Sequence, residues 1–315
     1  MKVLITGGGG FIGSHLADRV LSEGGQALVI DNYRTGRRDN LKPQAGLTVI
    51  EGSIADKSLV DDAFESFRPD HVVHAACSYH DPDDWAEDSC TNVMGTVHVI
   101  RAAEKIGMSG RFIYYQTALR YGLVPKEQPI TLTHPIVGAG SSYAVSKTAA
   151  ELYINMSSLD YVTFVLANCY GPRNISGPLP TFYHRLSQGL SCFVTDTRRD
   201  FVYVSDLIDV TILALGGKGR KGSYHVSSGS DMAIKELFDA TVSAMELPSD
   251  TPVDVRERNP DDVYTILLDP GVTESDFAWK TKVALSEGVP STVAYYKEFG
   301  INQTYTHLRH EENKQ

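Results

Sequence analysis

The chain has 315 residues, of which 42% are hydrophobic, and a formal net charge of −10. This length suits one large α/β unit or two lobes. The acidic balance argues against a nucleic-acid or membrane-surface partner. Four cysteines (Cys77, Cys90, Cys169, Cys192) show neither C-x-x-C pairing nor metal-finger spacing, and no cleavable signal pattern opens the chain. We therefore expect a cytoplasmic protein without a metal site.

The first predicted unit is a strand, a glycine cluster and a helix. Residues 3–6 form an apolar run of strand length, and a helical pattern follows Gly13. Between them, Gly7, Gly10 and Gly13 repeat at a spacing of three. Such glycines allow a tight turn and a close approach of backbone to pyrophosphate, whose charge the helix N-terminus stabilises. The pattern predicts a dinucleotide-binding unit.

An acidic residue ends the second predicted strand. Residues 27–30 are apolar and lead into Asp31, close to the spacing of about 20 residues expected for a carboxylate that bonds ribose hydroxyls. A carboxylate repels a 2′-phosphate, so NAD is favoured over NADP. Arg34, Arg37 and Arg38 follow and offer an alternative phosphate site, but we interpret them as solvated loop charges.

Strands and helices then alternate. We predict strands over 47–50, 71–74, 111–117 and 161–167, and helices over 57–67, over 88–107 and from Tyr143 onward. Such alternation indicates a doubly wound parallel sheet with right-handed crossovers, whose ligands lie at the carboxyl ends of the strands. Thr117 stands at one such end.

Tyr143 and Lys147 form a candidate acid–base pair. Residues four apart share one face of a helix, so phenol and ammonium can point into the same space. A nearby cation favours phenolate, and lowering a tyrosine pKa from about 10 to about 7 needs roughly 4 kcal/mol. An ordinary half-buried Tyr beside a Lys is the alternative, and the glycine motif favours the functional interpretation.

At this point the residues resemble a family, the extended short-chain dehydrogenase/reductases that act as NAD-dependent nucleotide-sugar epimerases and dehydratases. The resemblance covers about two-thirds of the chain. Its motifs are residues 6–15, Asp31-Asn32, His74-Ala75-Ala76, residues 92–96, Thr117 with Tyr121-Gly122, Tyr143 with Lys147, residues 168–173 and residues 199–206.

The resemblance implies a Rossmann-type sheet with a smaller C-terminal α/β lobe. The NAD-binding domain would span 1–167, with a segment near 200–230 returning to it. The nucleotide-sugar-binding lobe would span 168–315, with a polar tail from 307. The implied NAD contacts are Gly7, Gly10, Phe11, Ile12, Gly13, Asp31, Asn32, Ser53, Ile54, Ala75, Ala76, Asn92, Tyr143 and Lys147.

Catalytic and substrate roles follow from the same resemblance. Tyr143 matches the catalytic base, Lys147 the residue that lowers its pKa, and Thr117 the hydroxyl that bonds the sugar oxygen being oxidised. The implied substrate contacts are Thr117, Asn168 and Arg199, with Arg258 or Asn259 as a second diphosphate contact. Phe193 either stacks on the nucleotide base or packs in the core.

The residues after Thr117 favour one reaction. Relatives that dehydrate the sugar carry Asp-Glu there, and those that decarboxylate it carry a Glu, whereas this chain has Ala118 and Leu119, which transfer no protons. A C4 epimerisation through a transient 4-keto sugar needs only Tyr143. Gln116 stands where the family usually has Ser.

Alternatives remain at this stage. They are a nucleotide-sugar dehydrogenase or reductase, a dehydratase and, least favoured, a non-enzymatic NAD-sensing protein. Residues 195–201 resemble the surface-polysaccharide branch of the epimerases. We expect a homodimer formed through the helices at 88–107 and 142–158.

Overall fold

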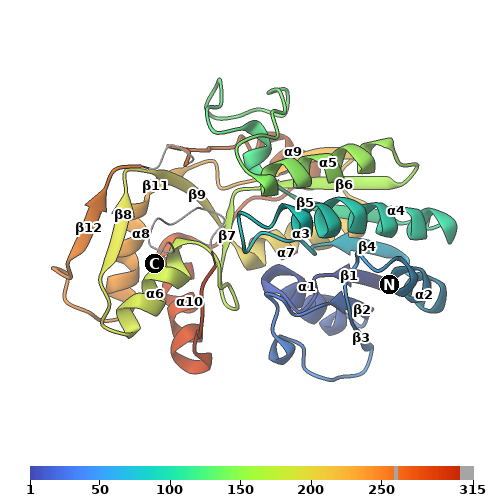
Figure 1. Ribbon diagram of the computed structural model, residues 1–315, viewed down its shortest axis with the longest axis horizontal. Helices are drawn as coiled ribbons and strands as arrows, with labels where there is room; N and C mark the ends of the chain where they lie inside the picture. The colour runs from blue at the N-terminus through green and yellow to red at the C-terminus, as the bar shows by residue number, and fades with distance from the viewer. Residues whose placement is uncertain (259–261, 306–315) are drawn as a thin grey trace.

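A seven-stranded parallel sheet forms the centre of the larger lobe in the computed structural model, which describes residues 1–258 and 262–305 (Figure 1). The strand order is β10-β6-β5-β4-β1-β2-β3. The strands are β1 (Lys2–Thr6), β2 (Gln26–Asp31), β3 (Leu47–Glu51), β4 (His71–His74), β5 (Arg111–Thr117), β6 (Asp160–Leu166) and β10 (Gly222–Val226). This arrangement confirms the predicted Rossmann-type fold.

Helices cover both faces of this sheet (Figure 1). One face packs on α1 and α7, and the other packs on α2, α4 and α5, each through its own apolar core. The helices are α1 (Phe11–Ser22), α2 (Lys57–Phe67), α4 (Thr96–Lys105), α5 (Ser142–Met156), α7 (Val204–Leu215) and the short α9 (Gly271–Phe277) beside β10. Both faces of the strands are therefore buried, as their continuous apolar runs indicate.

Side-chain caps fix where two of these helices begin. Asp56 accepts hydrogen bonds from the N–H groups of Ser58 and Leu59 at the start of α2. Ser141 accepts one from Ala144 at the start of α5. Each cap satisfies N–H groups that the first turn leaves without a helical partner, and so sets the helix register. At α5 this register places Tyr143 in the first turn.

The predicted helix over 88–107 is observed as one continuous helical run over 85–105, which changes form in its interior. The observed segment begins with α3 (Trp85–Asp88), continues as the π-helix η2 (Ser89–Gly95) and ends with α4 at Lys105. Inside the π-helix, the Asn92 side chain donates to the Ser78 carbonyl at 3.0 Å and accepts from the Ser78 N–H at 2.8 Å. The wider turn is thus locked to the loop after β4 by tertiary bonds, which periodicity does not reveal.

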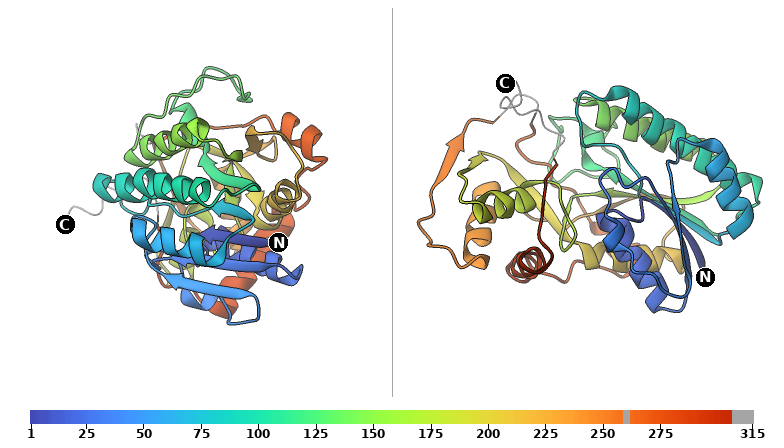
Figure 2. Two further views of the ribbon diagram at one scale, coloured as in Figure 1. Left: turned by 90° about the vertical axis from the view of Figure 1, so that its right-hand side faces the viewer. Right: turned by 60° about the horizontal axis from the view of Figure 1, so that its bottom comes forward.

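The smaller lobe lies beside the carboxyl ends of the strands (Figure 2). It has its own apolar core, shared by its helices and strands. Its elements are β7 (Asn168–Tyr170), α6 (Pro178–Ser187), β8 (Cys192–Thr195), β9 (Arg198–Tyr203), β11 (Asp231–Ala233), α8 (Ile234–Ala244), β12 (Val253–Arg256) and α10 (Leu285–Phe299). Short 3₁₀ turns η1 (Arg38–Asn40) and η3 (Ala118–Tyr121) lie in the larger lobe.

The chain returns from the smaller lobe to the larger one. Strand β10 follows β9 in sequence and pairs with β6, so Val226 lies opposite Leu166. The domain boundaries at 167 and 168 stay a prediction, and the polar tail from 307 lies outside the described residues. Over the described ranges, we find no helix with the length and apolar character needed to cross a membrane.

Candidate active site

The glycine turn after β1 has no room for side chains. A Cβ on Gly7, whose φ is +69°, would lie 2.7 Å from the Ala76 Cα, and one on Gly13 would lie 2.4 Å from the Gly7 carbonyl oxygen. Within the described chain no side chain caps the start of α1, which faces the cleft between the lobes. Free helical N–H groups beside bare backbone suit a pyrophosphate.

The carboxylate of Asp31 closes this turn from the end of β2. It accepts hydrogen bonds from the Gly9 N–H at 2.8 Å and the Tyr33 N–H at 2.7 Å. Burial raises the pKa of Asp31, and these two bonds oppose the rise. Asp31 and Asn32 line the cleft, which is where a ribose contact is predicted.

The three arginines after Asp31 are already paired. Arg34 contacts Asp84 and Glu87, Arg37 contacts Asp39, and Arg38 contacts Glu51. The sequence interpretation as solvated loop charges therefore needs refinement, because each guanidinium has a carboxylate partner. A 2′-phosphate at this place would compete with those carboxylates, which agrees with NAD as the cofactor.

A directed chain of hydrogen bonds holds the loop after β4. Thr96 donates to the Asn92 carbonyl at 2.6 Å, so its oxygen accepts from the His74 Nε2–H at 2.8 Å. The other ring nitrogen of His74 then accepts from Thr6 at 2.6 Å. Burial lowers the pKa of His74 to about 3, so the ring stays neutral. The histidine thus joins β1 and β4 to the start of α4 beside the cleft.

Most predicted cofactor residues meet at the cleft. Those that line it are Gly7, Gly10, Phe11, Ile12, Gly13, Asp31, Asn32, Ser53, Ile54, Ala75, Ala76, Tyr143 and Lys147. Asn92 does not line the cleft formed by the described residues. It is buried behind the cleft, where it bonds Ser78 and, at 3.0 Å, the Ser146 hydroxyl.

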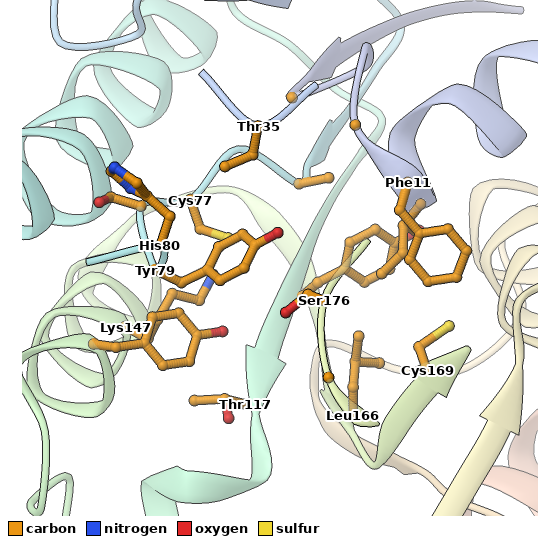
Figure 3. A pocket seen from close by; sticks show the side chains of 18 of the residues that line it. Phe11, Thr35, Cys77, Tyr79, His80, Thr117, Lys147, Leu166, Cys169 and Ser176 are labelled. Atoms are coloured by element: carbon orange, nitrogen blue, oxygen red, sulfur yellow. The ribbon is translucent and has the colours of Figure 1, made fainter. Parts of the chain in front are cut away.

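Thr117, Tyr143 and Lys147 converge from β5 and α5. The side chains of Thr117 and Lys147 lie on one side of the cleft in Figure 3, with Phe11 and Cys169 on the other. Tyr143 hydrogen-bonds Thr117. The Lys147 ammonium lies 4.0 Å from the centroid of the Tyr114 ring, a cation–π contact, and the Tyr114 hydroxyl donates to the Lys147 carbonyl at 3.0 Å.

Burial dominates the protonation of this pair. It lowers the pKa of Lys147 to about 8, while Cys77 and Glu151 oppose the shift. Burial also raises the pKa of Tyr143 well above its ordinary value, and the bond with Thr117 opposes that rise. The sequence predicted a lowered tyrosine pKa, so the direction differs, because desolvation of the phenolate outweighs the favourable contacts of the protein alone.

Ala118 and Leu119 form the turn η3 directly after Thr117. Both line the cleft, and the Leu119 N–H donates to the Thr117 hydroxyl oxygen at 3.2 Å. The site therefore presents apolar groups at the two positions where proton transfer to neighbouring sugar carbons would need acids.

The predicted substrate residues are divided. Asn168 and Arg199 line the cleft, and Arg199 is paired with Asp262. Phe193 and Arg258 are not among the described residues that line it. The Phe193 ring packs under the Arg256 guanidinium at 4.2 Å, and Arg258 is exposed near Tyr264. Asn259, the alternative to Arg258, lies outside the described residues.

Sequence reasoning gave no role to several residues at this cleft. Tyr79 follows β4, and its ring centroid lies 6.3 Å from that of Tyr143. Its hydroxyl bonds Thr35 of the larger lobe and Ser176 of the smaller one. The sequence signal that could have indicated a role for Tyr79 in the site was its place in the loop directly after a predicted strand. The described residues hold no group of three His, Cys, Asp or Glu side chains that could bind a metal ion.

The parallel sheet, the glycine turn, the acid that ends β2 and the Tyr–Lys pair on α5 together define a dinucleotide-dependent enzyme of the short-chain dehydrogenase/reductase class. The model of the NAD dependent epimerase/dehydratase family matches residues 3–227, and the chain belongs to this family. The family depends on NAD, which confirms the predicted cofactor.

Similar proteins cover nearly the whole chain. A UDP-glucose 4-epimerase of Mycolicibacterium smegmatis is 30% identical over 94% of this chain and 99% of its own. The Bordetella bronchiseptica enzyme WbmH, crystallised with NAD+, is 53% identical, with a TM-score of 0.91 over 95% of this chain and 99% of its own. A Thermotoga maritima UDP-glucose 4-epimerase with UDP-glucose is 28% identical, with a TM-score of 0.87 over 95% and 99%.

Proposed function

We propose that this chain is an NAD-dependent nucleotide-sugar epimerase that inverts C4 of the sugar through a transient 4-keto intermediate. One observation carries the proposal. Tyr143, which is half-buried, bonds Thr117 and shares its helix with Lys147, while Ala118 and Leu119 after Thr117 offer no further acid or base. Epimerases of the same family are similar over almost the whole chain.

Each side chain has a separate role in the proposed reaction. Tyr143 takes the proton from the C4 hydroxyl and later returns it, and Thr117 bonds the same sugar oxygen. NAD, when bound, supplies a reversible hydride acceptor and a positive ring. Lys147 lines the same cleft and adds a second positive charge, which favours the phenolate against the burial that raises the pKa of Tyr143. Because the proton and the hydride both return to the sugar, the reaction consumes no cofactor.

Further substrate contacts are proposed from the smaller lobe. Arg199 and Asn168 bind the diphosphate, since a guanidinium can bond phosphate oxygens in pairs. Phe193 as a stacking partner of the base and Arg258 as a second phosphate contact remain predictions. In the structure Phe193 packs on Arg256, while Arg258 contacts Tyr264 and donates to the carbonyl of Asp262, which lines the cleft.

The assembly and setting are also proposals. We propose a homodimer formed through α5 and the helical segment from α3 to α4. Four apolar side chains of α5 are exposed, Val145, Leu152, Tyr153 and Met156, as is Met94 of η2. We further propose cytoplasmic action in polysaccharide biosynthesis, on the resemblance of residues 195–201 to that branch of the family.

Turnover by purified protein tests the function. Nucleotide sugars are screened by NMR for C4 inversion, and the dinucleotide released by denaturation is identified. Tyr143→Phe should abolish inversion and still retain NAD, because the phenol hydroxyl is the base and the ring only packs. Tyr161→Phe on β6 is a matched control. A Tyr143→Phe protein that inverts C4 at the wild-type rate, or NADH that accumulates in step with product, would contradict the proposal.

A further inference from the structure

A buried amide lies directly behind the catalytic residues. Gln116 precedes Thr117 on β5 and is 1% exposed. Its side-chain oxygen accepts from the Thr117 N–H at 2.8 Å. Its nitrogen donates to the Lys147 carbonyl at 3.1 Å and to the Glu151 carboxylate at 2.8 Å. One side chain therefore joins the end of β5 to the turn of α5 that carries Lys147.

The partners leave one orientation for this amide. The Thr117 N–H can only donate, and the Lys147 carbonyl and the Glu151 carboxylate can only accept, so a flipped amide would lose all three bonds. Serine, the residue that this family usually has here, is too short to span from β5 to Glu151. The three bonds are thus a property of the longer residue in this chain.

An ion pair holds the far side of the cluster. Arg120 of η3 contacts Glu151 with side chains that are 3% and 1% exposed. The Ser223 hydroxyl of β10 donates to the same carboxylate at 3.2 Å. With Gln116, three side chains donate hydrogen bonds to the Glu151 carboxylate in the interior. A buried carboxylate with these partners has little freedom to move, and it fixes the amide that bonds it.

A second chain of bonds fixes Arg120. Its guanidinium donates to the Tyr121 hydroxyl at 2.9 Å, and that hydroxyl donates to His225 Nε2 at 2.6 Å. His225 in turn donates through Nδ1 to the Asp269 carbonyl at 3.0 Å. These bonds assign each shared proton to one donor, and they connect the end of β5 with β10, which lies two strands away in the sheet.

We propose that Gln116, held by the Arg120–Glu151 pair, is a positioning residue of the epimerase reaction. This inference rests on the proposed function. Gln116 fixes the Thr117 backbone, and with it the hydroxyl that bonds Tyr143. Through the Lys147 carbonyl it also fixes the helical turn that carries the Lys147 side chain into the cleft. The two catalytic elements thereby keep one spacing.

Charge supports the same assignment. Glu151 follows Lys147 by one helical turn, and its negative charge raises the pKa of Lys147 against the effect of burial. The cluster therefore acts on the ammonium twice, once through the backbone carbonyl and once through the field of its carboxylate. If the cluster served stability alone, neither its bond to the Lys147 carbonyl nor the field of Glu151 would need to act on Lys147.

Gln116→Met removes the three bonds and keeps the length of the side chain. We expect kcat to fall about 10- to 100-fold, because a small misplacement of reacting groups is costly, with KM changed less than about threefold. The matched control is Thr211→Val on α7, which removes the buried bond to the Tyr115 hydroxyl on the opposite face of the sheet. It should lower the melting temperature similarly and leave kcat unchanged.

Gln116→Glu keeps the shape and provides a second test if the first variant folds poorly. Its carboxyl group would lie beside Glu151, and like charges raise the pKa of the new acid. The protonated form can still donate one bond, so kcat should approach the wild-type value at low pH and fall as pH rises. Wild type, whose amide does not titrate, should lack this fall below about pH 8, where Lys147 keeps its charge.

A titration without turnover separates this inference from the proposed function. Subtracting the absorbance of NAD-loaded Tyr143→Phe from that of NAD-loaded wild type gives the phenolate absorbance of Tyr143 at each pH. The same subtraction is then made with both proteins carrying Gln116→Met. We expect the phenol to titrate at higher pH in that background. A shifted titration in a protein that inverts no sugar would reject the function alone. If Gln116→Met has the same phenol titration and the same kcat as wild type, the positioning role is overturned.

Discussion

Lys147 shows how burial opposes the charge that the proposed mechanism requires. The ammonium is almost fully enclosed, and its pKa falls from 10.5 to about 8. Between these two values the unfolded chain binds a proton that the folded chain does not, so the folded state gains stability as pH rises through this window. Below pH 8 the charged group is retained at a cost to stability.

This cost can be measured by removing the charge. Lys147→Met should abolish turnover and remove the pH-dependent term. We expect the free energy of unfolding of wild type to rise by about 2 kcal/mol relative to the variant between about pH 7 and about pH 9.5. Urea denaturation at the two pH values gives the comparison. Parallel pH profiles for the two proteins would show that Lys147 has an ordinary pKa in the fold.

Single residues differed in how far the sequence revealed them. The spacing of Tyr143 and Lys147 predicts a shared helical face, and both line the cleft. Gln116 was visible only as a departure from the usual serine, because its role depends on bonds to a helix about thirty residues away. The direction of the Tyr143 pKa also required burial to be known. Linear patterns contain neither distance nor desolvation.

At the scale of elements, the ion pair of Arg120 and Glu151 joins η3 to α5 inside the protein. Removing one member of a buried pair leaves the other charged without a partner, at a cost of about 3–5 kcal/mol. Arg120→Met should therefore be strongly destabilising. Arg120→Met combined with Glu151→Met should recover most of the loss. Urea denaturation of the single and double variants tests this, and equal stabilities for the two would contradict it.

The elements themselves were predicted well where periodicity alone decides. The helix at 57–67 and the strands at 71–74 and 111–117 appear with the predicted bounds. The helix predicted at 88–107 appears as a helical run over 85–105, but its π-helical interior was not predicted, since that form depends on the bonds of Asn92 to Ser78. The short strands of the smaller lobe were not predicted either. Each is stabilised by pairing with distant segments, as β8 is with β12.

At the scale of the whole molecule, the proposed homodimer depends on the apolar residues that are exposed on α5. Leu152 and Met156 lie one turn apart and point away from the core. Leu152→Glu with Met156→Glu should turn a dimer into a monomer, because like charges would meet at the shared surface. Analytical ultracentrifugation measures the mass. Val255→Glu on the exposed strand β12 is the control and should leave the mass unchanged. A monomeric wild type would contradict the proposal.

The return of β10 to the large sheet has a consequence for how this protein can be divided. A gene fragment that stops after β6 would leave that strand as a bare edge, with its backbone hydrogen-bonding groups open to other chains. Such an edge favours aggregation. The two lobes therefore cannot be expressed, exchanged or recombined as separate modules cut at one point, and circular permutation is the better route to altering either lobe.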